Sequence, residues 1–175
     1  MNSSSRATLH MLWGNIASGK STLARELATN PSTILIAEDD WIARLYSGQL
    51  ETMADYLLCS KKLREVVGPH VVDLLRIGIS VALDFQANTP SSRLWMRRLF
   101  EAAGADHRLH VLDVPTEICR ARLYARNAAG THDFDADDAL FDEVTSYIVP
   151  PDESEGFTIV RYYSANATRN ESDRP

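Results

Sequence analysis

Cysteine is scarce in this sequence: only two occur among its 175 residues, Cys59 and Cys119. They lie far apart and match no metal-ligand spacing, which argues against a disulfide-stapled secreted domain and against a cysteine zinc site. We therefore expect both to be buried, reduced thiols. The five histidines form no metal motif either, since the spacing of His107 and His110 would place them on opposite faces of one strand.

Long hydrophobic runs and an excess of positive charge are also missing. No stretch approaches the roughly 20 apolar residues that cross a membrane, and the apolar run after the start MNSSSR is too short for a secretory signal. The net charge of −6 and the pI of about 5.3 make the chain a poor partner for long nucleic acids. We expect a cytoplasmic protein that binds no membrane and is poorly suited to long nucleic acids, although a local basic groove is still possible.

Internal repeats, interdomain linkers and low-complexity tracts are absent as well. Hydrophobic residues make up 45% and charged residues 24% of the chain, as is typical of globular domains, and its length suits one domain with a core of its own. We expect a single domain over residues 1–163, followed by a polar, disordered tail over residues 164–175.

The strongest positive signal is the stretch LWGNIASGKST at residues 12–22. It contains G-x-x-x-x-G-K-[ST], the phosphate-binding loop motif. Glycines let backbone N–H groups surround phosphates, and a helix beginning at Lys20 would add the positive end of its dipole. Lys20 is expected to reach the β- and γ-phosphates, and the Ser21 hydroxyl to ligate Mg²⁺. The residues predicted to bind ATP here are Gly14, Asn15, Ile16, Ala17, Ser18, Gly19, Lys20, Ser21 and Thr22.

Strand and helix patterns alternate along the chain. Strands are predicted at residues 8–13, 32–37, 79–83, 108–112 and 157–160. Helices are predicted at residues 21–28, 41–46, 90–103, 115–126 and 137–148, with Thr89 as a cap and a polar connector at 130–135. Residues 52–77 are predicted to form two more helices, broken near Gly68 and Pro69. This pattern indicates an α/β domain with a five-stranded parallel sheet covered on both faces and a helical insertion between its second and third strands.

Carboxylates follow the predicted strands, at the sheet edge where such folds bind ligands. Asp84 follows the third strand and is expected to hold the water shell of Mg²⁺ beside Ser21. Asp39 and Asp40 follow the second strand, and adjacent residues point in different directions. We place Asp40 as the N-cap of a helix that begins at Trp41, which leaves Asp39 to orient a substrate hydroxyl for attack on the γ-phosphate.

Two further groups of residues are candidates for the site. Arg122 and Arg126 lie four residues apart on one helix and so share a face; they would form a lid over the transferring phosphoryl group, or else a solvated basic face paired with nearby acids. The helical insertion is expected to recognise the acceptor, although aromatic residues at helical spacing are often core residues. Acceptor-binding candidates there and across the cleft are Trp41, Arg44, Tyr46, Tyr56, Asn88, Arg93 and Trp95.

These motifs resemble those of one known group of enzymes. The phosphate loop, the E-D-D ending at Asp40, the stretch from Asp84 through Asn88 to Pro90 and the D-V-P at residues 113–115 are similar to motifs of the P-loop kinase group that includes polynucleotide 5′-kinases, zeta toxins and chloramphenicol phosphotransferase. Over residues 9–127 the chain looks most like small bacterial ATP-binding proteins of the AAA_33 type.

The resemblance implies the kinase-like strand order 2-3-1-4-5, a catalytic-base role for Asp39, and phosphate contacts from the lid residues Arg122 and Arg126. One position departs from the polynucleotide kinases, which carry an arginine where this chain has Ile42. That arginine helps to bind the acceptor's phosphate, so its absence argues against a polynucleotide end as substrate.

From these patterns we predict an ATP- and Mg²⁺-dependent phosphotransferase that acts on a hydroxyl of a small molecule. Two alternatives stay open: a nucleotide or nucleic-acid 5′-end kinase, and a regulatory module that binds nucleotide and hydrolyses ATP slowly. An acceptor-shaped cleft beside Asp39 would favour the kinase, and a large exposed apolar patch the module. Residues 132–134 and 150–157 lie outside the motifs and are interpreted either as a turn or as a contact to the purine or lid.

Overall fold

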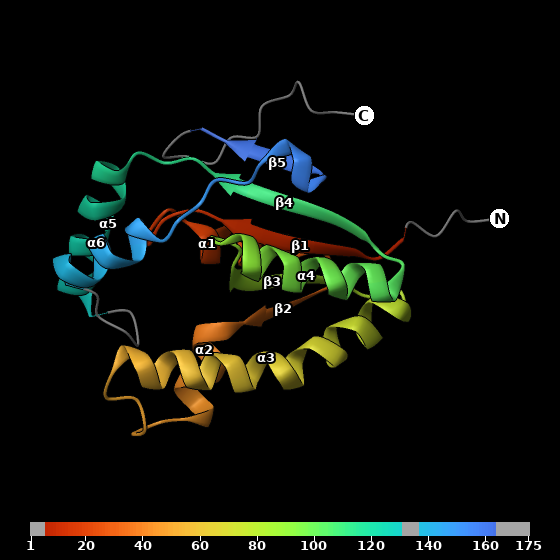
Figure 1. Cartoon of the computed structure of the whole chain (residues 1–175), viewed down its shortest axis with the longest axis horizontal. Helices are drawn as coiled ribbons and strands as arrows, with labels where there is room; N and C mark the ends of the chain where they lie inside the picture. Colours follow the sequence, from red (N-terminus) through yellow and green to blue (C-terminus); the bar gives the residue numbers. More distant parts are fainter. Residues whose placement is uncertain (1–5, 131–136, 164–175) are drawn as a thin grey trace.

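The computed structural model describes residues 6–130 and 137–163. Its five parallel strands form one sheet with the order β2-β3-β1-β4-β5 (Figure 1), which confirms the predicted α/β fold and strand order. The strands are β1 (Thr8–Trp13), β2 (Thr33–Ala37), β3 (Ser80–Gln86), β4 (Asp106–Leu112) and β5 (Ile159–Tyr162).

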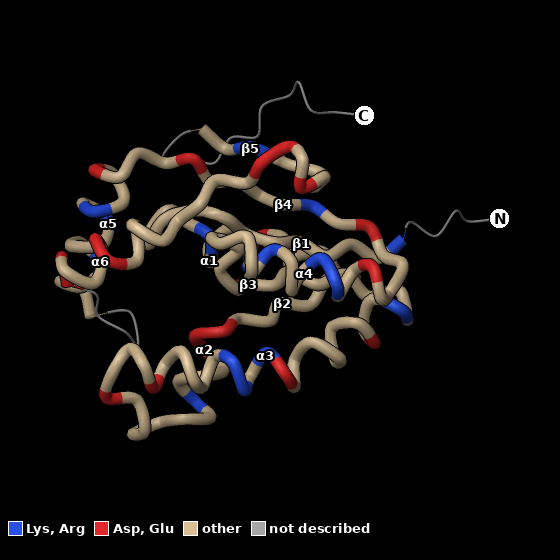
Figure 2. Tube along the Cα trace, in the orientation of Figure 1, with Lys and Arg blue, Asp and Glu red and all other residues tan. Residues whose placement is uncertain are grey.

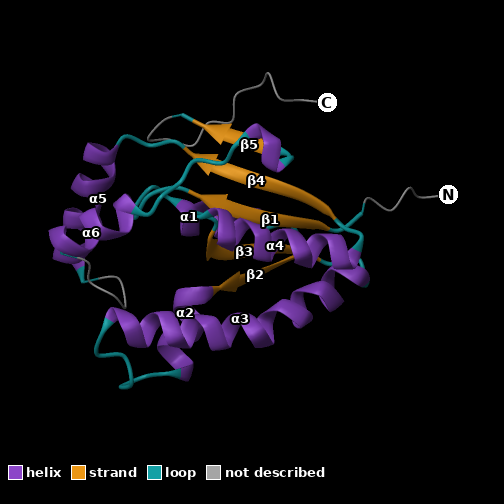
Figure 3. Ribbon diagram, in the orientation of Figure 1, coloured by secondary structure: helices purple, strands orange, loops and turns teal. Residues whose placement is uncertain are grey.

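Helices cover both faces of the sheet. They are α1 (Lys20–Leu27), α2 (Glu38–Leu45), α3 (Met53–Arg76), α4 (Pro90–Ala103), α5 (Thr116–Ala129) and α6 (Asp138–Ser146), with a short 3₁₀ turn, η1 (Glu153–Glu155). Adjacent residues of a strand point to opposite faces. Met11 of β1 therefore packs in the core shared with α3 and α4, whereas Leu12 packs against Leu23 and Ala24 of α1. Figure 3 shows α3 and α4 packed side by side on the same face of the sheet.

The predicted break in the helical insertion is wrong, because α3 is one continuous helix that contains Pro69. A proline inside a helix removes one backbone hydrogen bond and costs roughly 3 kcal/mol. Leu63, Val67 and Val71 lie on one face of α3 on either side of Gly68, and all three are buried in the core. Their packing keeps the helix together across the proline, which faces solvent.

The turn from β2 into α2 also differs from the prediction. α2 begins at Glu38, directly after β2, and Ala37 is its N-cap. Asp40 lies inside the first turn, so the prediction that it caps a helix starting at Trp41 is wrong. The acidic first turn, Glu38 to Asp40, lies at the positive end of the helix dipole, which stabilises it without a capping side chain. Figure 2 marks this acidic start of α2 in red.

β3 is longer than predicted, because it continues through Asp84 to Gln86. Asp84 pairs in register with Ala37, the last residue of β2. The start of α2 therefore lies beside Asp84 at the carboxyl edge of the sheet, next to the phosphate loop. This register brings the predicted site residues of two strands together.

Several other predictions concern caps, thiols and chain ends. Thr89 caps α4, as predicted, and both cysteines are buried and free. The predicted tail at residues 164–175 and the part of the connector at residues 131–135 lie outside the described residues. No helix in the part of the chain that the structure describes is long and apolar enough to cross a membrane.

The two strand histidines confirm the expected side-chain alternation. His107 stacks on Phe100 of α4, with ring centroids 4.1 Å apart. His110 lies 2.9 Å from the hydroxyl of Tyr162 on the other face of the sheet. The two rings therefore cannot ligate the same metal ion.

Candidate active site

The phosphate loop joins β1 to α1 at the carboxyl edge of the sheet, and its glycines are required by geometry. Gly14 has φ +152° and Gly19 φ +105°, and a Cβ on Gly14 would lie 2.7 Å from Ser18 Oγ and 3.0 Å from the Leu112 carbonyl oxygen. Gly19 is the N-cap of α1, and no side chain caps this helix. The first N–H groups of α1 are therefore available to a phosphate.

Lys20 lies inside the curl of this loop. Its Nζ donates to the carbonyl oxygens of Gly14 at 2.8 Å and Asn15 at 2.7 Å. Burial lowers the pKa of Lys20 to about 8, and the charge of Asp84 opposes this shift. At neutral pH the ammonium therefore stays charged, with loop carbonyls as its hydrogen-bond partners. A nucleotide phosphate would supply the stronger, oppositely charged partner.

Ser21 and Asp84 meet between α1 and β3. The Ser21 hydroxyl hydrogen-bonds to Asp84, and burial raises the pKa of this carboxyl. A desolvated carboxylate beside a hydroxyl fits Mg²⁺, which binds through one or two carboxylates together with phosphate oxygens and water. Among the described residues, no group of three or more His, Cys, Asp or Glu could hold a metal. A cation at Ser21 and Asp84 would therefore need phosphate oxygens and water as further ligands.

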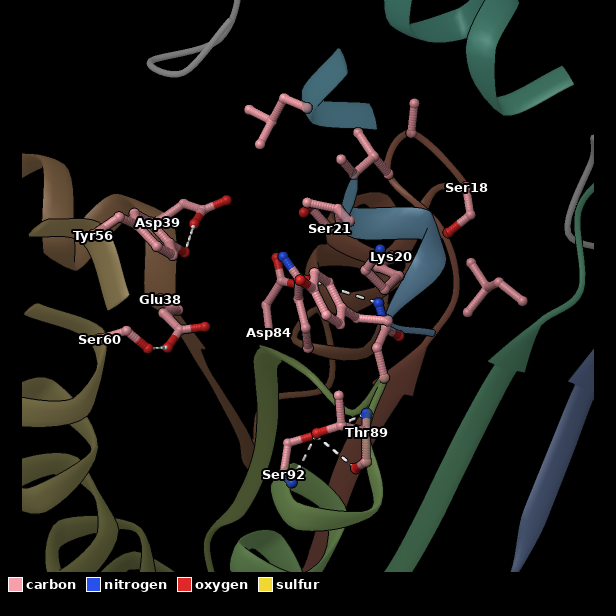
Figure 4. Close-up of a pocket in the computed structure, with 18 of the residues that line it drawn as sticks. Ser18, Lys20, Ser21, Glu38, Asp39, Tyr56, Ser60, Asp84, Thr89 and Ser92 are labelled. Carbon is pink, nitrogen blue, oxygen red and sulfur yellow. Dashed lines mark hydrogen bonds between the residues drawn. The ribbon is translucent and has the colours of Figure 1, made fainter. Parts of the chain in front are cut away.

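Asp39 lies in the first turn of α2, on the opposite side of the cleft from the loop. The Tyr56 hydroxyl on α3 donates to Asp39 Oδ1 at 2.6 Å. Burial, and secondly the charge of Asp39, raises the pKa of Tyr56, so its hydroxyl remains a donor. Figure 4 shows the Asp39 carboxylate on one side of the cleft and Ser21 and Asp84 on the other side.

A second carboxylate, Glu38, lines the cleft beside Asp39. The sequence motifs did not predict a role for it at the site. The Ser60 hydroxyl donates to it, and Arg64 Nε lies 3.2 Å from the same oxygen. Ser60 and Arg64 are four residues apart on α3, so a shared helix face was detectable. The sequence does not show that this face of α3 packs against the start of α2, because that contact depends on the tertiary structure.

Only some of the predicted acceptor-binding residues line the cleft. Tyr56, Asn88 and Trp95 do so, but Trp41 and Arg44 are absent from its described lining. Both lie on α2, where the cleft is lined by the first turn alone. The prediction that Trp41 and Arg44 contact the acceptor is therefore not supported by their positions.

Arg93 is fully buried and lies outside the cleft, so its predicted contact with the acceptor is wrong. Its Nε and Nη2 each lie 2.7 Å from the carboxylate of Glu155. Its Nη1 donates to the carbonyl oxygens of Ala87 at 3.0 Å and Val149 at 2.9 Å. Arg93 thus ties α4 to the segment that leads into β5.

Asn88 holds the phosphate loop. Its Oδ1 accepts from the Gly14 N–H and its Nδ2 donates to the Gly14 carbonyl, both at 3.0 Å. Nδ2 also lies 3.4 Å from Gln86 Oε1. These partners make Asn88 a positioning residue for the loop, in place of the acceptor contact that was predicted.

The two arginines predicted to form a lid, and helix α6, lie next to the phosphate loop. Arg122 and Arg126 both line the cleft, and Arg122 Nη1 donates to the Ser18 carbonyl at 3.3 Å. A solvated basic face that pairs with nearby acids describes their neighbour Arg120. It forms ion pairs with Asp138 and Asp142 of α6.

α6 had no predicted role at the site, yet it contacts the loop directly. Thr145 donates from its hydroxyl to Asn15 Oδ1 at 3.0 Å. Leu140, Val144 and Tyr147 line the same cleft. No sequence motif marks this helix, so only its packing reveals that it borders the phosphate loop.

One cavity of about 1860 Å³ is bordered by the phosphate loop, the start of α2, Asp84 and the two arginines of α5, Arg122 and Arg126. Sites for a single small ligand usually enclose about 300–1,000 Å³. The cleft is therefore large enough for two ligands, one on the loop side and one on the side of Glu38 and Asp39.

Known proteins share this architecture. The sequence model of the AAA_33 family, described as an AAA domain, matches residues 9–151. No curated protein matches the chain by sequence.

Three solved structures illustrate the shared fold. A candidate kinase from Chloroflexus aurantiacus has a TM-score of 0.73 at 18% identity, over 93% of this chain and 87% of that one. The APS kinase CysC of Mycobacterium tuberculosis, in complex with AMPPNP and APS, has a TM-score of 0.57 at 21% identity, over 98% and 91%. A chain of the Pnkp1/Rnl/Hen1 RNA repair complex has a TM-score of 0.65 at 23% identity, over 83% of this chain and 45% of that one.

Proposed function

This chain belongs to the AAA_33 family, within the P-loop kinase group, and from that premise we propose that it is an ATP- and Mg²⁺-dependent phosphotransferase that acts on a hydroxyl of a small molecule. The observation that supports this most directly is the position of Asp39. Its carboxylate faces the phosphate loop across a cleft with room for two ligands, as a base that acts on an acceptor must.

The loop side of the cleft suits ATP. The uncapped start of α1 offers backbone N–H groups, and Lys20 offers a cation inside the loop. Bound Mg²⁺ would neutralise charge on the β- and γ-phosphate oxygens, and Ser21 and Asp84 are the residues that fit it. The similar fold of an APS kinase that holds AMPPNP supports the choice of ATP.

The transfer needs little covalent chemistry from the protein. The acceptor oxygen attacks the γ-phosphorus and forms a new O–P bond, while the bond to the β–γ bridging oxygen breaks and ADP leaves with the electron pair. The hydroxyl proton passes to the free oxygen of Asp39. Tyr56 holds the other oxygen and so fixes the direction from which the base acts.

Arg122 and Arg126 would stabilise the charge that spreads over the transferring group. Both lie on α5, and Arg122 contacts the carbonyl oxygen of Ser18 in the loop. A contact that strengthens in the transition state accelerates the chemical step. A cytoplasmic location suits this activity, because ATP and Mg²⁺ are available there.

The test is transfer of label from γ-labelled ATP to a panel of hydroxyl compounds, including 5′-hydroxyl oligonucleotides. Label on a small acceptor, well above label released as free phosphate, is the expected result. Lys20→Ala, prepared in the same way, is the control for contaminating kinases. Label only on the oligonucleotides would support the end-kinase alternative, and free phosphate from every mixture would support the regulatory ATPase.

A further inference from the structure

The acceptor side of the cleft holds a carboxylate that the proposed transfer does not use. Glu38 precedes Asp39 in the first turn of α2, and both line the cleft. Figure 4 shows the two side chains next to each other, with Glu38 on the side of Asp84. Only 4% of Glu38 is exposed, and a charge in such a place must be paired and hydrogen-bonded.

Glu38 is paired but retains capacity to accept hydrogen bonds. Ser60 and Arg64 Nε both donate to Oε1. Oε2 has one long contact, 3.5 Å, to Arg64 Nη2. Since an ionised carboxylate can accept about four hydrogen bonds, Oε2 can accept one from a molecule in the cleft.

Arg64 offers donors beside that oxygen. Its guanidinium lies over the rings of Phe85 and Trp95, 5.7 Å and 5.2 Å from their centroids, which fixes its plane. Its side chain is 26% exposed and lines the cleft. Within the described part of the chain, Nη1 of Arg64 donates to no side chain or carbonyl, so its two N–H groups are available to a ligand.

The charges of this pair restrict the chemistry of its ligand. An anionic group would suit Arg64 but would be repelled by Glu38 and Asp39, and an ammonium group would suit Glu38 but be repelled by Arg64. A hydroxyl group donates one hydrogen bond and accepts others. It can therefore satisfy both members of the pair without leaving a charge unmatched.

We propose that the acceptor is a polyhydroxy compound, a sugar or sugar alcohol, whose hydroxyl next to the phosphorylated position binds the Glu38–Arg64 pair. Glu38 and Asp39 are consecutive residues of one helical turn, so neighbouring hydroxyls of one molecule can reach both. This inference rests on the proposed phosphotransferase function and names the substrate class of the same site.

The first test uses the unmodified protein and γ-labelled ATP. Sugar alcohols and aldoses are compared with deoxy analogues that lack the hydroxyl next to the labelled position, and with phosphorylated sugars and amino alcohols. Transfer should be best to the polyhydroxy compounds, and loss of the neighbouring hydroxyl should lower kcat/KM about 10- to 100-fold, as expected for a hydrogen bond to a charged group. A preference for the anionic or amino compounds would overturn the inference.

The second test is Glu38→Gln, with Asp40→Asn as the matched control. Asp40 lies in the same turn but is exposed and outside the described cleft lining, so its variant should behave like the unmodified protein. In Glu38→Gln the difference between each acceptor and its deoxy analogue should largely disappear, while the KM for ATP stays unchanged. A purely structural role for Glu38 would instead lower activity toward both acceptors equally and would contradict the inference.

The two proposals fail in different ways. If no acceptor receives label, the proposed function itself is wrong. If label is transferred regardless of the neighbouring hydroxyl, the protein is a phosphotransferase but Glu38 and Arg64 do not select its substrate. The deoxy comparison does not depend on any variant, so it decides the matter even if Glu38→Gln does not fold.

Discussion

Tyr56 and Asp39 come from different helices and share a hydrogen bond of 2.6 Å, from the phenol hydroxyl to Asp39 Oδ1. The raised pKa of Tyr56, which results first from burial, keeps this hydroxyl protonated over the range in which enzymes work. The orientation of Asp39 is therefore set by α3, and one carboxylate oxygen remains for a substrate proton.

Asp39→Asn should lower kcat by about 10²- to 10⁴-fold, the usual value of a positioned base, while the affinity for ATP is retained. Asp40→Asn should be close to the unmodified protein, because Asp40 is exposed in the same helical turn. Acceptor phosphorylation and ATP binding are measured for both. An inactive Asp40 variant beside an active Asp39 variant would mean that the two roles are reversed, and two active variants would mean that neither carboxylate is the base.

Arg122→Ala and Arg126→Ala should each lower kcat more than they raise the KM for ATP, because the arginine contacts are expected chiefly in the transition state. Arg120→Ala is the matched control, since Arg120 lies on the same helix but pairs with acids of α6. Steady-state kinetics of the three variants measure the difference. Equal kcat values in all three would show that the lid arginines take no part in the transfer.

Asn88→Ala should weaken ATP binding and lower the free energy of unfolding. It removes both hydrogen bonds to Gly14, and an unsatisfied buried backbone group costs about 1–3 kcal/mol. ATP affinity and denaturant unfolding are the measurements. An unchanged ATP affinity would show that the loop keeps its shape without Asn88.

ATP binding should take up a proton at alkaline pH through Lys20. Burial lowers the pKa of Lys20 to about 8, and bound phosphates would raise it again. Calorimetry in buffers of different ionisation enthalpy should detect little proton uptake at about pH 7, where Lys20 is already charged, and close to one proton at about pH 9. A binding heat that does not depend on the buffer at either pH would contradict this prediction.

The same shift makes the stability of the nucleotide-free protein depend on pH. The pKa of Lys20 lies below the ordinary lysine value of 10.5, so the unfolded chain binds more protons between about pH 8 and pH 10.5. The contribution of Lys20 to the free energy of unfolding therefore rises with pH across this window.

Arg93→Met should lower the free energy of unfolding by about 3 kcal/mol, the lower end of the range for a broken buried ion pair, because Glu155 remains 23% exposed. Below the melting temperature its KM for the acceptor should equal that of the unmodified protein. Thermal unfolding and acceptor kinetics are measured together. A raised acceptor KM with unchanged stability would restore Arg93 as an acceptor contact.

The sequence by itself determined the fold, the strand order through its family resemblance, and the phosphate loop. These depend on short-range features: glycine spacing from Gly14 to Gly19, apolar strands, and caps such as Thr89. The local prediction was wrong at Pro69, where burial of the flanking residues contributes more than the proline costs. It was also wrong at the start of α2, where the helix dipole stabilises an acidic first turn without a capping side chain.

Only the tertiary structure decided which polar side chains face the cleft. Arg93 and Arg64 are both arginines on long helices that pack against the core, and the sequence favoured Arg93 as the ligand contact. In the folded chain Arg93 is buried against Glu155, 62 residues away, whereas Arg64 lies at the cleft beside Glu38, 26 residues away. Helical periodicity shows which residues share a face, but the partner of that face is set by contacts between segments that are distant in sequence.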